Sequence, residues 1–246
     1  MYRPSVNFSK GNSNSGSFSE TLNNELIPIN QKEATNRQTN DRFSTNGSLQ
    51  FNRKLNSKGR NIALRLYYNL DNGNSDRYSL ANTYYLKYGD SIKVQNQWID
   101  NLNRNHEYRV QLTYMEPVFT NHFIEINYSY QHRSSLSEKY AYDWNDLEDS
   151  YSQYPDTAQS DCYKNKYSIH QVGAFFRTIR TNYFYNIGIE IEPQQTTNQS
   201  YMRDTTLEYS SRNAINYAPT MNFKYTFSKQ TTLRINYRGR TTQPSM

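Results

Sequence analysis

The sequence lacks the features that mark most enzymes. Its 246 residues include a single cysteine, Cys162, so the chain cannot form an internal disulfide or a cysteine-based zinc site. No histidine–carboxylate pair stands near Cys162 to activate it, and we expect an ordinary thiol in a polar loop. A glycine-rich phosphate loop, a serine nucleophile elbow and an HExxH motif are also missing. We therefore expect no enzymatic activity, no catalytic residue and no cofactor.

Metal-ligand spacing is missing as well. The four histidines, His106, His122, His132 and His170, are far apart, and each lies at or near the end of an expected strand. We expect them on polar strand faces or at strand rims, and we predict no metal-binding residue among them.

Apolar residues are scarce. Only 35% of the residues are hydrophobic, against about 45–50%, with glycine counted, in ordinary soluble domains, and the mean hydropathy is −1.03. No apolar run approaches the roughly 18 residues of a transmembrane helix. Disordered chains are also poor in apolar residues, but they lack aromatics, and this chain has 24 tyrosines and 11 phenylalanines. The charge of +6 comes from scattered Lys and Arg, without the basic cluster of a nucleic-acid-binding protein.

What the sequence does contain is a repeated period of two. In residues 123–133, FIEINYSYQHR, the apolar or aromatic residues Ile124, Ile126, Tyr128 and Tyr130 alternate with polar ones. Successive side chains of a strand point to opposite faces, so this pattern predicts a strand with one apolar and one polar face. The same alternation occurs in residues 48–55, 61–70, 77–86, 91–99, 107–115, 168–180, 183–191, 215–227 and 231–240. We predict an all-β chain of ten to twelve strands and no helix.

The connections between these strands differ in a regular way. Residues 56–60, 116–121, 180–182 and 228–230 are short turns, whereas 134–162 is long and polar. Short turns at one end and long loops at the other are typical of antiparallel up-and-down transmembrane β-barrels. A tilted strand of about 10 residues crosses the hydrocarbon core. We therefore predict that the apolar faces contact lipid, that 134–162 lies outside the cell, and that 116–121 and 228–230 face the periplasm.

Tyrosines near the expected strand ends fit this arrangement, because an amphipathic ring is stable at the headgroup level of a membrane. The alternative is that tyrosine is simply a good strand former. The tyrosines concerned are Tyr67, Tyr68, Tyr84, Tyr85, Tyr128, Tyr130, Tyr183, Tyr185 and Tyr237.

Three segments also resemble a known family. LNSKGRNIALRL (55–66) is similar to the hairpin of the outer-membrane β-barrel in TonB-dependent receptors of Bacteroidota, and LTYMEPVFTNHFIEINYSYQHR (112–133) resembles its Y-x-E-P turn and following strand. The segment INYAPTMNFKYTFSKQTTLRINYRGRTTQPSM (215–246) resembles a third pattern of that family. The matching residues there are Pro219, Tyr237, Arg240, Pro244 and Ser245. Together the three segments extend the resemblance over about residues 45–246.

The resemblance implies part of a receptor barrel of about 22 strands with a plugged lumen. We expect residues 1–246 to be an internal fragment, roughly half of the barrel, with regular hairpins in 45–246, a less regular segment 1–44 and no plug domain. The implied location is the bacterial outer membrane. The implied partners are its lipid, the rest of the receptor chain with its plug, the energy-coupling protein TonB, and a small-molecule or glycan substrate; nucleic acid is not among them.

Two other readings stay open, a soluble carbohydrate-binding β-structure and a self-contained barrel of 12 strands acting as a porin, adhesin or outer-membrane enzyme. The small barrel would need strands near 6–8 and 233–237 to pair, and residues 10–44 look too irregular for it. For substrate, the acidic and aromatic loop 140–156 is the candidate contact region, although the sequence assigns no binding residue. The acids of this loop lack the spacing of an EF-hand calcium loop, and we expect them to be solvated. They are Asp143, Asp146, Glu148 and Asp149.

Overall fold

The computed structural model describes residues 2–86, 91–202 and 205–239, which form one antiparallel sheet and contain no helix. The strands are β1 (Tyr2–Leu22), β2 (Pro28–Lys54), β3 (Asn61–Tyr85), β4 (Ser91–Phe119), β5 (His122–Asn145), β6 (Ser150–Tyr151), β7 (Asp161–Ile179), β8 (Tyr183–Met202), β9 (Thr205–Thr226) and β10 (Thr232–Arg238). Their order in the sheet is the order of the sequence, except that the two-residue β6 pairs only with β5. Among the described residues, no helix is long and apolar enough to cross a membrane.

The predicted alternation between two faces is present and continues from strand to strand. Leu112 of β4 pairs with Tyr128 of β5, which pairs with Val172 of β7, and Val172 pairs with Ile191 of β8. We call the face that carries these four side chains the outer face. All four are exposed, by 39–49% of their surface. The opposite, inner face carries mainly polar residues, several of them buried.

The apolar part of the outer face forms a band across the sheet. It covers residues 183–191 in β8 and 215–225 in β9, close to the roughly 9–11 residues that a tilted strand needs to cross a bilayer. Beyond this band the strands continue with mainly polar residues, apart from an aromatic cluster on the outer face, and β3 and β4 reach 25 and 29 residues. The structure therefore has a membrane-sized apolar zone and a long polar extension.

This extension corrects several predicted strand boundaries. Residues 61–70 and 77–86 were expected to be separate strands, yet both belong to β3, which ends at Tyr85. Likewise, 91–99 and 107–115 both belong to β4. The segment 10–44, expected to be irregular, lies mostly within β1 and β2 and is paired almost throughout. Backbone hydrogen bonds hold these polar segments in the ladder, which a reading based on apolar alternation does not detect.

Four short turns lie at one end of the sheet, which we call the proximal end. They fall close to the predicted positions, at 55–60, 120–121, 180–182 and 227–231. In the first, the side-chain oxygen of Asn56 accepts hydrogen bonds from the backbone N–H groups of Lys58 and Arg60, and Gly59 supplies a left-handed residue with φ of 104°. Arg60 then forms an ion pair with Glu116 of β4 at 2.5 Å, which ties two neighbouring turns together.

The opposite, distal end differs from the prediction. Residues 134–162 were expected to be one long loop, but β5 continues to Asn145 and β7 begins at Asp161. Only residues 146–160 remain between them, and they include β6. The turn between β1 and β2, residues 23–27, is also short. Most of the polar residues predicted as extracellular loop are thus extended strand.

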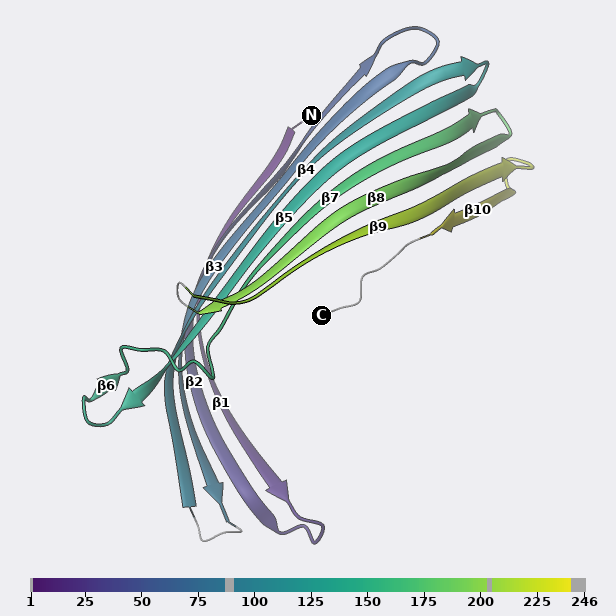
Figure 1. Cartoon of the computed structure of the whole chain (residues 1–246). Coiled ribbons are helices and arrows are strands. Elements are labelled where there is room, and N and C mark those ends of the chain that lie inside the picture. Colours follow the sequence, from purple (N-terminus) through teal and green to yellow (C-terminus); the bar gives the residue numbers. More distant parts are fainter. Residues whose placement is uncertain (1, 87–90, 203–204, 240–246) are drawn as a thin grey trace.

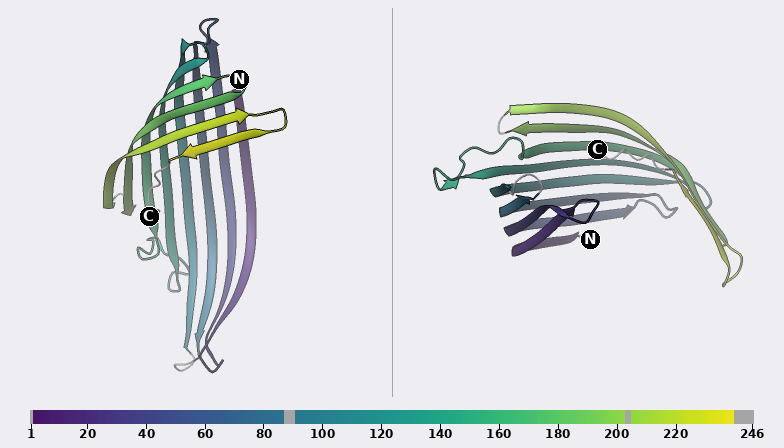
Figure 2. Two further views of the ribbon diagram at one scale, coloured as in Figure 1. Left: turned by 90° about the vertical axis from the view of Figure 1, so that its right-hand side faces the viewer. Right: turned by 90° about the horizontal axis from the view of Figure 1, so that it is seen from below.

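The sheet is long, curved and open, as Figures 1 and 2 show from three directions. β1 pairs only with β2 and β10 only with β9, so both are edge strands. The pairing between β1 and β10 that a self-contained small barrel would need is not formed. Of the residues behind the third resemblance, Arg240, Pro244 and Ser245 lie outside the described part of the chain.

The tyrosine prediction holds for some residues and fails for others. Tyr68, Tyr128, Tyr130, Tyr183, Tyr185 and Tyr237 lie on the outer face, within or at the border of the apolar band. Tyr67, in contrast, lies on the inner face, because it pairs with the inner-face residue Arg109. Tyr84 and Tyr85 stand at the distal end of β3, far from the band. Adjacent tyrosines alternate between faces, so proximity to a strand end does not place both at a membrane border.

Arginine at Leu112 should destabilise the protein in a lipid bilayer, because this side chain lies within the apolar band. We expect the free energy of unfolding to fall by about 2–4 kcal/mol if the position is near the bilayer midplane. Arginine at the neighbouring inner-face Gln111 is the matched control and should cost far less. Denaturant titration of both variants in lipid measures the difference, and equal losses would contradict the assignment of the outer face to lipid.

Candidate functional site

Polar contacts organise the inner face beside the apolar band. Glu125 of β5 forms an ion pair with Arg177 of β7 at 2.5 Å, and both side chains are largely shielded from solvent. Gln131 accepts a hydrogen bond from Arg109 at 2.5 Å and donates one to Glu107 at 2.9 Å. Charges and amides are therefore paired across neighbouring strands, which suits a wall that faces water rather than lipid.

A polar groove lies farther along the inner face, in the distal extension. Its cavity measures about 470 Å³ and spans five neighbouring strands and the loop before β7. The lining residues are Ser17, Ser19, Lys32, Ala34, Asn36, Arg77, Ser79, Ala81, Gln95, Gln97, Ile99, Lys139, Ala141 and Gln159. We call this set the distal groove.

The register of the sheet explains how these residues meet. Arg77 of β3 pairs with Ile99 of β4, and Ile99 pairs with Ala141 of β5. One pair of positions farther toward the distal end, Ser79 pairs with Gln97. Small side chains on adjacent strands leave a depression, and the longer amide and cationic side chains surround it.

The chemistry of the groove is dominated by hydrogen-bond donors and positive charge. Lys32, Arg77 and Lys139 are its charged lining residues, and the lining set contains no acid. Lys139 also forms an ion pair with Asp161 at 3.9 Å. The Nε atom of Arg77 is buried and has no hydrogen-bond partner among the described residues. An anionic or hydroxyl-rich ligand would supply the acceptors that these groups need.

Glutamine side chains fix one wall of the groove. Gln97 donates to the carboxylate of Asp143 at 2.7 Å, and Gln95 donates to the side-chain oxygen of Gln159 at 3.0 Å. Gln159 also donates to Asp156, and this hydrogen bond holds the pKa of the Asp156 carboxyl below its ordinary value. The loop before β7 is thus attached to the groove through its own side chains.

An aromatic cluster on the outer face anchors the same loop from the other side. Tyr151 of β6 lies against Tyr78, Trp98 and Trp144, with ring centroids 5.1–6.4 Å apart. Trp98 stacks on Tyr142 at 4.8 Å. Burial raises the pKa of Tyr151, whose hydroxyl donates to Asn96. The predicted contact loop 140–156 is therefore a structured arm, and only its tip projects freely.

The acids of this loop are not gathered at one point. Asp143 lies on the inner face beside Gln97, whereas Asp146, Glu148 and Asp149 are exposed at the tip. No group of three or more potential metal ligands occurs in the described parts of the chain. The predicted contact region 140–156 thus contributes Ala141 to the groove, and Gln159 reaches the groove from just beyond this region. The sequence reading missed the cations and amides of β2, β3 and β4, because they look like ordinary strand residues.

Two further sequence predictions need correction. Cys162 is 2% exposed and lies at the start of β7, not in a loop. His106, His132 and His170 lie on the outer face within strands, neither on the polar inner face nor at a strand rim: His106 pairs with Ser134, and His132 and His170 pair with outer-face partners. His122 does lie at a rim, as predicted, at the proximal end of β5, where it contacts Thr178 at 2.7 Å. The period-two alternation predicts the face of each of these positions correctly. The error came from treating histidine as a residue of the polar face.

Comparison with known families agrees with this architecture. Residues 53–246 match the Outer membrane protein beta-barrel family. The chain belongs to this family. No curated protein sequence matches the chain. Membership explains the apolar band, the polar inner face and the up-and-down order of the strands, and it places the protein in the bacterial outer membrane, in contact with its lipid.

The long connection 146–160 at the distal end predicts the orientation of the protein in that membrane. The exposed tip near Leu147, which is 97% exposed, should lie outside the cell, and Thr120 of a proximal turn should face the periplasm. An epitope tag inserted at Glu148 should bind antibody on intact cells. A tag at Thr120 should bind antibody only after the outer membrane is permeabilised. The reverse labelling would mean that the protein has the opposite orientation.

Proposed function

We propose that the sheet is part of the barrel wall of a TonB-dependent receptor that takes up an acidic small molecule or glycan. The observation that carries the proposal is the open sheet. In the apolar band, β1 and β10 each have one unpaired edge, and an unpaired backbone group in hydrocarbon costs several kcal/mol. In this proposal further strands pair with these edges, which makes the wall larger than the nine strands of the described main sheet path.

A large barrel is the architecture in which a plug is needed. Small barrels of about 8 strands are filled by side chains, whereas those of about 22 strands have a lumen wide enough for a plug domain. The resemblance of the turns at 55–66 and 112–133 to receptor hairpins supports the same choice. In this proposal the plug belongs to the rest of the receptor, TonB supplies energy through it, and the barrel performs no catalysis.

The distal groove is the proposed contact for substrate. It lies on the inner face of the distal extension. In the predicted orientation the distal end is extracellular, so a molecule entering the barrel would meet the groove before reaching the membrane zone. Lys32 and Arg77 offer charge-assisted hydrogen bonds, which suit carboxylate or phosphate groups. Gln95 and Gln97 have the paired donors and acceptors that sugar hydroxyls require.

The receptor assignment predicts a physical complex with TonB. The protein extracted from its own outer membrane should be retained by the immobilised periplasmic domain of TonB from the same cell. A passive porin from that membrane is the control and should pass through. If the protein is not retained and also shows stable, ungated ion conductance in planar bilayers, the receptor proposal is wrong. The protein would then be a self-contained pore.

The substrate assignment predicts that neutralising the groove weakens binding of an acidic glycan. With oligogalacturonate as the probe, the Lys32→Gln, Arg77→Gln double variant should bind at least about tenfold more weakly, because charged hydrogen bonds contribute about 1.5–3 kcal/mol each. Isothermal calorimetry on the extracted protein measures this. The outer-face variant Lys10→Gln loses one charge away from the groove and should bind normally. Equal binding by all forms would exclude the groove as the glycan site.

A further inference from the structure

The outer face carries a group of positive charges just beyond the apolar band. Arg104 of β4, and Lys164 and Lys166 of β7, lie on this face, because each pairs with an outer-face position of β5 between them. His106 of β4 and His132 of β5 are their neighbours on the proximal side. We call Arg104, Lys164 and Lys166 the distal cationic patch.

The register shows how closely these groups lie. Arg104 and Lys164 both pair with Leu136, and His106 and Lys166 both pair with Ser134. The three cations therefore occupy two adjacent outer-face rows across three strands, with neighbouring strands about 4.8 Å apart. The next row toward the apolar band contains Tyr108 and His132, whose rings stack at 5.1 Å. From the distal to the proximal side, the outer face thus carries the distal cationic patch, then this aromatic row, and then the apolar band.

The cations of the patch are not held in ion pairs with acids of the described residues. The ion pairs found in residues 2–86, 91–202 and 205–239 do not involve Arg104, Lys164 or Lys166. The nearest acid on the same face of β5 is Glu138, one row farther from the membrane, and it accepts a hydrogen bond from Tyr201. Burial and this hydrogen bond raise the pKa of Tyr201. Glu138 and Asp100 of β4 thus border the patch on its distal side, but the ion pairs of the described residues join neither acid to the patch.

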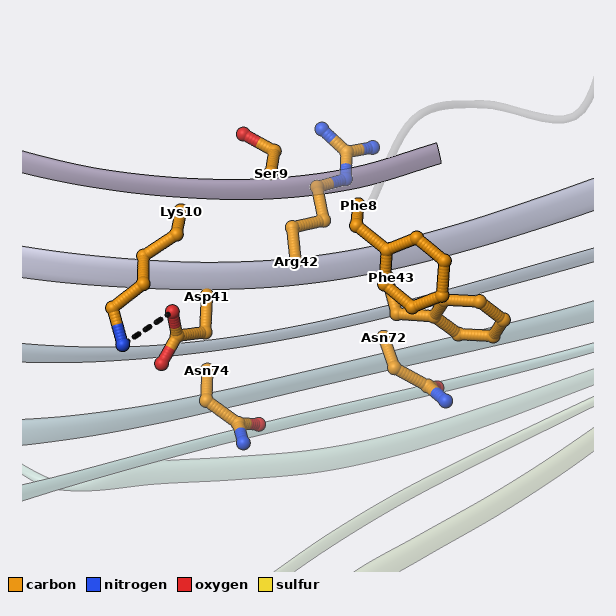
Figure 3. A pocket seen from close by; sticks show the side chains of 8 residues that line it. All are labelled: Phe8, Ser9, Lys10, Asp41, Arg42, Phe43, Asn72 and Asn74. Atoms are coloured by element: carbon orange, nitrogen blue, oxygen red, sulfur yellow. Dashed lines mark ion pairs between the residues drawn. The ribbon is translucent and has the colours of Figure 1, made fainter. Parts of the chain in front are cut away.

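The distal border of the apolar band on β1 and β2 differs from the border on β4 and β7, as Figure 3 shows. There the rings of Phe8 and Phe43, 4.9 Å apart, mark the edge of the apolar band beside a cavity of about 440 Å³. The next outer-face lysine, Lys10, lies 3.5 Å from the carboxylate of Asp41. Cations without an ion-pair partner thus occur at this border on β4 and β7, whereas the lysine on β1 is paired.

We propose that the distal cationic patch binds the negatively charged phosphate headgroup of an outer-leaflet lipid. The patch is continuous with the lipid-facing band, so a lipid whose chains lie against Val110 and Val172 has its headgroup beside the three cations. Lysine and arginine near an anionic membrane surface contribute about tenfold or less to binding per residue at physiological salt. His106 and His132 add hydrogen-bonding groups at the same level.

The test uses the protein extracted from its own outer membrane into neutral detergent. Native mass spectrometry then measures retention of phosphatidylglycerol, the anionic probe, and of phosphatidylcholine, the neutral one. The native protein should prefer phosphatidylglycerol, and the Arg104→Gln, Lys164→Gln, Lys166→Gln variant should bind it at least about tenfold more weakly. Binding of phosphatidylcholine should not change. Inorganic phosphate should not displace the lipid, because it lacks the chains that contact the band.

A matched control removes three charges from the inner face. Arg65, Arg109 and Arg133 lie on the inner face of β3, β4 and β5, nearer the proximal end than the patch, and their replacement by glutamine should leave lipid binding unchanged. If the triple outer-face variant does not insert, the single Lys166→Gln variant, at an exposed position, gives the same comparison with a smaller loss. Equal lipid binding by the native protein and the outer-face variants, or displacement by inorganic phosphate, would overturn the proposal.

Discussion

Satisfaction of backbone hydrogen bonds in lipid is the constraint on which the rest of this structure depends. Hydrocarbon offers no partner to an N–H or C=O group, so a strand can cross it only when both neighbours complete its ladder. The long antiparallel register from β2 to β9 meets this requirement for every interior strand of the main path. It also forces side chains into strict alternation, and that alternation separates the lipid-facing surface from the water-facing one.

Alternation allows a chain of such low hydropathy to be a membrane protein. Only one face of each strand, over one membrane thickness, needs apolar residues, and those residues are supplied by Ile, Leu, Val and Tyr of the band. The inner face can then hold groups such as Glu125 and Arg177, which would be too costly in lipid but stabilise each other at 2.5 Å beside water. A mean hydropathy of −1.03 and a membrane location are therefore compatible.

The sequence predicted the features that depend on local chemistry. The apolar band, the four proximal turns and the face of residues such as Leu112 and Ile126 follow from alternation and turn residues, and the structure confirms them. The length of β3 and β4 was not predictable in this way. Residues 71–76 and 100–106 are polar on both faces apart from Leu102, so the pattern there carries no sign of a strand, and only pairing between neighbours keeps these two segments extended.

The distal groove was beyond sequence reasoning for a related reason. Lys32, Arg77 and Lys139 are separated by 45 or more residues, and they meet only because the register aligns the ends of β2, β3 and β5. These side chains can meet because the distal segments that the sequence predicts as loop or irregular chain are paired strands. A flexible loop would lose conformational entropy on holding a ligand, whereas strands fixed in one ladder present their side chains already ordered. A barrel wall that continues beyond the membrane can therefore carry a binding surface on rigid strands, and only the arm between β5 and β7 needs separate anchoring by Tyr151 and its aromatic neighbours.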